Sequence, residues 1–99
     1  VLGRVEVAAR LGDSAEIAED LYKRSLAINV ALGRKEGIAA DLGNLGLIAK
    51  MRSDVAEACR LWSEALALYR QIGARPMVER VSGWLREAGC PDAPPEDAA

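Results

Sequence analysis

The side chains of this chain that could act as nucleophiles have no histidine to activate them, because the sequence contains none. A serine or cysteine nucleophile usually needs an adjacent base. The serines fall at expected helix starts or on helix surfaces, and they are Ser14, Ser25, Ser53, Ser63 and Ser82. Carboxylates gather at the start of a predicted helix, where they favour its dipole, and no glycine-rich loop follows a strand. We therefore expect no enzyme activity and no cofactor.

The two cysteines, Cys59 and Cys90, lie 31 positions apart and match no metal-ligand spacing. The sequence thus predicts no metal site. A disulfide between them stays open at this point. Two separated thiols without a signal peptide are more typical of a reducing compartment, so we expect a cytoplasmic protein.

Charge and hydropathy limit the classes of partner. The formal net charge is −2 and the isoelectric point is about 5.1, which gives no general attraction to nucleic acid. The longest apolar run, near residues 45–49, is far shorter than the roughly 20 residues that cross a bilayer. We expect a protein or peptide as partner, with neither nucleic acid nor membrane.

An internal repeat organises the whole chain. Shifting the sequence by 40 residues aligns one set of apolar and small residues with another: Leu2 with Leu42, Gly3 with Gly43 and Gly83, Val5 with Leu45 and Leu85, Ala18 with Ala58, Tyr22 with Trp62, and Gly33 with Gly73. Such a period is the signature of a repeat architecture. Within each period the apolar residues recur at helical spacing.

The breaks in this spacing predict where helices end. They fall at residues 12–14 and 52–54 and at Gly33 and Gly73, where glycine suits a helix C-cap. Ser53 or Asp54 can cap the following helix, with Glu57 completing a capping box. The prediction is an all-α chain of five helices, at about residues 1–11, 15–32, 36–51, 54–72 and 76–88. The prolines and acids of residues 90–99 predict a disordered tail.

The stretch "LGNLGLIAKMRSDVAEACRLWSEALALYRQIG" resembles a tetratricopeptide repeat, and the 40-residue period is similar to the subclass found in kinesin light chain, spindle-orienting G-protein regulators and bacterial regulators. The resemblance implies a short right-handed solenoid of antiparallel helical hairpins. Its units would span residues 1–34, truncated at the N-terminal edge, and 35–74, followed by a half-repeat or capping helix at 75–89. The sequence departs from the motif at Glu6, Ser53 and Arg70.

The glycines inside the repeat need a physical reason, since each costs a helix about 0.5–1 kcal/mol relative to alanine. Gly46 and Ala58 are expected to let two helices approach closely, so that Trp62 fills the space beside them. Gly43 recurs as Gly3 and Gly83. It either leaves the floor of a groove open or allows neighbouring helices to pack.

The resemblance implies a concave groove that binds a protein segment. Family geometry places ten residues on it: Val7, Arg10, Leu11, Gly43, Asn44, Leu47, Lys50, Met51, Arg80 and Trp84. The expected surface is apolar with a cationic edge. Relatives that bind extended peptides carry a second asparagine where this chain has Leu47, so an amphipathic helix is the expected ligand. The charges Arg10, Lys50 and Arg80 either recognise acidic groups or are simply solvated, and Trp84 either binds the partner or seals the stack.

Self-association is the alternative function. Repeat arrays bury a continuous core only by stacking, and this chain has about two and a half units. Leu2, Val5 and neighbouring apolar residues begin directly inside a helix without an N-cap. A homo-oligomer, such as a dimer formed by stacked repeat ends or by exchanged helices, would cover them.

Overall fold

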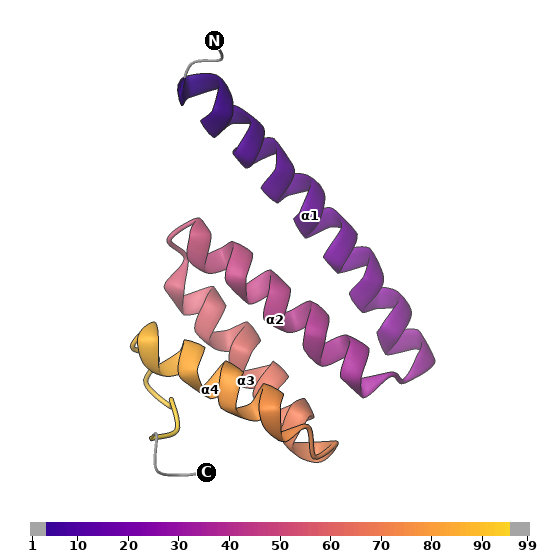
Figure 1. Cartoon of the computed structure of the whole chain (residues 1–99). Coiled ribbons are helices and arrows are strands. Elements are labelled where there is room, and N and C mark those ends of the chain that lie inside the picture. The colour runs from indigo at the N-terminus through magenta and orange to yellow at the C-terminus, as the bar shows by residue number, and fades with distance from the viewer. Residues whose placement is uncertain (1–3, 96–99) are drawn as a thin grey trace.

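The chain forms four α-helices over the residues described by the computed structural model, which are 4–95 for the backbone and 14–95 for the side chains. They are α1 (Arg4–Leu32), α2 (Lys35–Met51), α3 (Val55–Gln71) and α4 (Arg75–Glu87). No strand occurs between residues 4 and 95, so the all-α prediction is confirmed. Figure 1 shows α1 running antiparallel to α2 and projecting past its end, while α3 and α4 lie on the other side of α2.

The predicted break at residues 12–14 is wrong, because α1 is one continuous helix of 29 residues. Gly12, Asp13 and Ser14 each weaken a helix by only about 0.5–1 kcal/mol. This cost alone does not end a helix; a turn forms here only if packing of the two helices of a hairpin stabilises it. In the second unit that hairpin closes over Gly46. The equivalent residue of the first unit is Glu6, so an equally close hairpin could not form there. The predicted first hairpin is therefore replaced by a straight helix.

The joints that end α1 and α3 repeat each other across the 40-residue shift. Gly33 and Gly73 both adopt positive φ, at 67° and 70°. In both joints the residue after glycine donates its backbone N–H five residues back along the helix, from Arg34 to the Asn29 carbonyl at 3.0 Å and from Ala74 to the Tyr69 carbonyl at 2.9 Å. This is the Schellman pattern of helix ends. The predicted C-caps and the repeat of this joint are confirmed.

The turn between α2 and α3 has the same hydrogen bonding without a glycine. Ser53 takes a φ of 66°, a left-handed conformation that strains a residue with a side chain. Asp54 N–H donates to the Ala49 carbonyl at 2.8 Å, and the Asp54 carboxylate accepts from Glu57 N–H at 3.2 Å. Of the two predicted caps, Asp54 is the one that begins α3.

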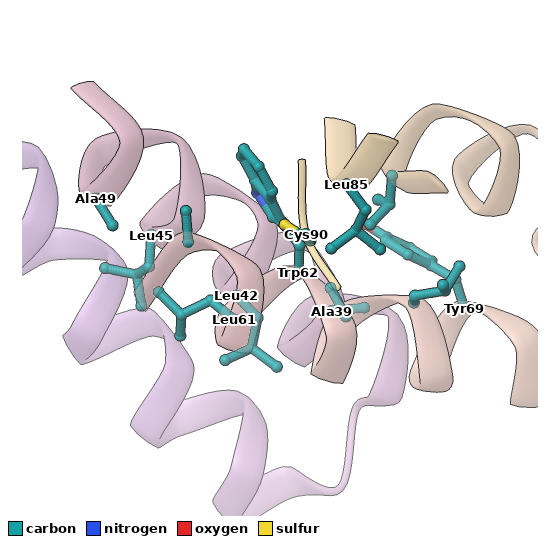
Figure 2. Packing of buried hydrophobic residues seen from close by; sticks show 13 residues of the cluster. Ala39, Leu42, Leu45, Ala49, Leu61, Trp62, Tyr69, Leu85 and Cys90 are labelled. Carbon is teal, nitrogen blue, oxygen red and sulfur yellow. The ribbon is translucent and has the colours of Figure 1, made fainter. Parts of the chain in front are cut away.

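The core lies between α2, α3 and α4 and is centred on the fully buried Trp62 (Figure 2). A Cβ atom added to Gly46 would collide with Nε1 and Cδ1 of Trp62, so the predicted role of this glycine is confirmed. The indole Nε1 donates a hydrogen bond to the Gly43 carbonyl at 3.1 Å. Close approach of α2 and α3 thus depends on the lack of a side chain at Gly46. The approach also gives a hydrogen-bond acceptor to Nε1, the only polar atom of the buried indole.

A disulfide joins Cys59 on α3 to Cys90, just after α4, with their Cα atoms 5.6 Å apart. This is the disulfide that the sequence left open. Cys90 is buried, and Ala93 packs against the core cluster. Arg86 also donates a hydrogen bond to the Pro94 carbonyl at 3.0 Å. The first residues of the predicted tail are thus attached to the helical body.

Among the described residues, no helix is both long enough and apolar enough to cross a membrane.

Candidate partner-binding surface

The outer face of α2 carries the apolar part of the predicted groove. Helical spacing puts Asn44, Leu47 and Met51 on one face of α2. Leu47 is 39% exposed and Met51 is 64% exposed, while Asn44 is half-buried. Lys50 is exposed in the same turn as Met51. These side chains offer an apolar strip with a cation beside it.

Trp84 on α4 borders this strip. A Cβ atom on Gly43 would lie 3.6 Å from Cζ3 of Trp84, so the indole ring of Trp84 reaches α2 at this glycine. The rings of Trp84 and Trp62 are tilted against each other with centroids 5.6 Å apart. Trp84 therefore has one side on the core and remains half-exposed on the other. It can both seal the core and touch a ligand, which are the two roles that the sequence left open.

Arg80 lies one turn before Trp84 on α4 and is exposed. Its charge acts on the buried phenol of Tyr69 on α3. Burial raises the pKa of Tyr69, the negative charge of Glu36 raises it further, and the positive charge of Arg80 opposes that rise. Arg80 thus acts on the same phenol as Glu36 in the first turn of α2, whereas Lys50 lies in the last turn of α2.

The surface so assembled consists of apolar side chains, the amide of Asn44 and the ammonium group of Lys50. No group of three or more potential metal ligands is present among the described residues. The side chains of Val7, Arg10 and Leu11 lie outside the described residues, and their backbone belongs to the straight α1. The structure therefore brings together the predicted residues of α2 with Trp84 of α4, and Arg80 lies one turn before Trp84.

A shallow hollow lies elsewhere, where the joint between α1 and α2 meets the joint between α3 and α4. None of the ten predicted groove residues lines it. The lining residues are Asn29, Gly33, Arg34, Lys35, Glu36, Gly37, Ala40, Ile72 and Ala74. Beside it, Asn29 Nδ2 donates a hydrogen bond to the buried Asp41 carboxylate at 2.9 Å. Gly37 makes room for this pair, since a Cβ there would lie 2.5 Å from Asn29 Cγ.

Sequence reasoning missed a second apolar surface, on the side of α1 that no other described helix covers. Its residues are Ile17, Leu21, Ile28 and Leu32, each more than half exposed. The repeat alignment contained a signal, since Leu21 and Ile28 align with Leu61 and Leu68. That signal predicted burial instead, because the first unit was expected to close as a hairpin.

No protein-family model, curated protein or solved structure matches this chain. The resemblance to tetratricopeptide repeats thus stays a prediction from the sequence.

Proposed function

We propose that this chain is a protein-binding module of the tetratricopeptide type, without catalytic activity, and that it binds a protein segment on the surface formed by α2 and α4. The observation that carries the proposal is the exposure of Leu47 and Met51 beside the half-exposed Trp84. Exposed apolar side chains that are contiguous on a rigid scaffold are typical of interaction sites. The matching joints at Gly33 and Gly73 support a repeated helical scaffold.

The proposed ligand is an amphipathic helix with an acidic edge. An apolar strip along one helix suits the apolar face of a second helix, read at positions three and four residues apart. Lys50 adds positive charge beside this strip, and Arg80 adds positive charge on α4. Acidic side chains on the ligand would meet these cations and fix its orientation.

Panning of a displayed peptide library on the purified chain tests this proposal. Selected peptides should alter the fluorescence of Trp84 and lose binding to Leu47→Asp. Ile72→Asp is the matched control, because Ile72 is also 39% exposed but lies at the end of α3, away from this surface. Peptides that bind Leu47→Asp as well as the unmodified chain, while both proteins keep their helicity, would show that the groove is wrongly assigned.

Self-association is a second candidate function, favoured by the exposed apolar face of α1. It uses a different helix from the peptide surface, so both functions are compatible in one chain. The two are separated by measuring solution mass and peptide binding on the same variants.

The cytoplasmic location predicted from the sequence rested in part on two separated cysteines being more typical of a reducing compartment. The disulfide removes that support, since disulfides persist mainly in oxidising compartments. Alkylation of unreduced protein, followed by mass determination, tests the thiol state. Two modified cysteines in protein taken directly from cells would restore the cytoplasmic proposal.

A further inference from the structure

The uncovered face of α1 has an arrangement that suits a partner identical to itself. Ile17, Leu21, Ile28 and Leu32 are exposed by 62%, 57%, 59% and 58%. Their positions place them on one side of α1. The strip is about 22 Å long at the rise of an α-helix. The opposite side of α1 packs on α2, where Tyr22 and Leu26 reach the core.

The spacing of these four residues is the same read in either direction. The intervals are four, seven and four residues, with a midpoint between Arg24 and Ser25. Two copies of α1 placed antiparallel about this midpoint would set Ile17 against Leu32 and Leu21 against Ile28, each pair formed twice. Such self-complementarity is what a two-fold symmetric interface requires.

The charges along α1 favour the same antiparallel arrangement. Residues 14–20 contain three acidic residues and no basic one, whereas residues 21–35 contain four basic residues and no acidic one. The acids are Glu16, Glu19 and Asp20, and the bases are Lys23, Arg24, Arg34 and Lys35. Antiparallel pairing about this midpoint brings Glu16 of one copy close to Arg34 of the other, while Arg24 of the two copies meets at the axis. There Arg24 keeps its own ion pair with Asp20 of the same chain. Parallel pairing would place like charges together.

The equivalent helix within the chain packs the two central positions of this strip, since the equivalents of Leu21 and Ile28 are both in contact with the core. Leu61 on α3 occupies the repeat position of Leu21, yet it is only 7% exposed in the core formed with α2. We propose that α1 packs antiparallel against α1 of a second copy, with the two-fold axis beside Arg24 and Ser25. This inference specifies the self-association proposed above and does not depend on the peptide surface of α2 and α4.

The interface would be smaller than the roughly 800 Å² per partner of a standard complex, so the dimer should dissociate in the micromolar range. Sedimentation equilibrium and light scattering between about 1 µM and about 1 mM would detect it. The expected result is a reversible change from monomer to dimer. A monomer at every concentration would overturn the proposal.

Two substitutions on α1 form a matched pair for this measurement. Ile28 and Val30 are both 59% exposed, but they lie on different sides of the helix. Ile28→Glu should weaken the dimer roughly a hundredfold, because it buries an uncompensated carboxylate twice in each symmetric interface. Val30→Glu should leave the dimer unchanged. Equal weakening by both variants, each with full helicity, would contradict the assigned face.

A double variant tests the antiparallel register. Leu21→Arg and Ile28→Glu should each weaken the dimer, while the two together should recover much of the affinity, because each arginine then meets a glutamate of the other copy. A parallel pair would bring arginine to arginine and show no recovery. Leu47→Asp serves as a separate readout: it should abolish peptide binding and leave the dimer intact. A dimer that dissociates with Leu47→Asp and persists with Ile28→Glu would overturn the α1 pairing.

Discussion

The second half of α1, residues 15–32, and helix α3 have matching sequence patterns and different environments. Leu21 is 57% exposed, whereas its equivalent Leu61 is 7% exposed. Tyr22 is half-buried, whereas its equivalent Trp62 is completely buried. Both helices contact the helix that follows them. Only α3 also has a preceding helix folded against it. The apolar pattern therefore predicts which face of a helix can be buried, but not whether another helix buries it.

The closing of the second hairpin explains the difference. Gly46 allows Trp62 to lie directly against α2, and the left-handed Ser53 reverses the chain. The equivalents in the first unit are Glu6 and Asp13, and the backbone at residue 13 is helical. A hairpin therefore requires room for a large ring as well as a turn, and α1 continues where that room is not provided.

Reduction of the disulfide should have the largest effect on the difference in burial between α1 and α3. Cys90 covers α3 on the side of α4, through a bond between residues separated by 31 positions. Closing a loop of that length restricts the unfolded chain, which is worth about 4 kcal/mol in the chain-entropy description. Urea unfolding with and without a reductant should show a loss of this size.

The double variant Cys59→Ala with Cys90→Ala is the control for this experiment, because its stability should not respond to the reductant. An unmodified chain with the same free energy of unfolding in both conditions would show that the disulfide does not stabilise α3 against α4.

Shortening the paired leucines should show the difference in burial directly. Leu61→Ala should lower the free energy of unfolding by about 3 kcal/mol, through lost burial and a residual cavity. Leu21→Ala should lower it by less than about 0.5 kcal/mol in dilute, monomeric protein, because the side chain is mostly in water already. Chemical denaturation at low concentration measures both. Equal losses would mean that a helix covers α1 in solution as well.

Adding a methyl group at two neighbouring glycines should show which of them a tryptophan ring requires to be glycine. Gly46→Ala should destabilise the chain by about 2 kcal/mol, because the methyl group displaces Trp62. Gly43→Ala should be neutral or stabilising by up to about 1 kcal/mol, since the added atom makes ordinary contact with Trp84 and the helix propensity improves. Thermal unfolding of both variants measures these changes. A stabilising Gly46→Ala would show that the close packing of α2 and α3 does not depend on the missing side chain at residue 46.

Glycine substitutions at the two equivalent turn positions should have the smallest effects, of opposite sign. Ser53→Gly should stabilise the chain by about 0.5–1 kcal/mol, because φ is positive at this residue. Asp13→Gly should give no gain, because it places a further glycine inside a continuous helix. Calorimetric melting temperatures compare the two. Stabilisation by Asp13→Gly would indicate that residue 13 forms a turn in solution.

Most of the helix boundaries were predictable because their causes are local. Periodic apolar residues, Asp54 as a cap and glycines that accept positive φ act within one or two turns of helix. The predicted helices at 36–51, 54–72 and 76–88 accordingly differ from α2, α3 and α4 by about one residue at either end. For the candidate surface, the same periodicity predicted which residues share the outer face of α2.

The sequence by itself thus determined the helices, the 40-residue repeat and the glycine that admits Trp62, since these follow from neighbours along the chain and from one steric rule. Only the tertiary structure decided that the first hairpin does not close, that Cys59 reaches Cys90, and that the apolar residues of α1 remain exposed. Each of these depends on whether surfaces far apart in the chain fit together. The spacing of apolar residues is nearly the same in both units, and this spacing alone does not distinguish a helix that is covered from one that is not.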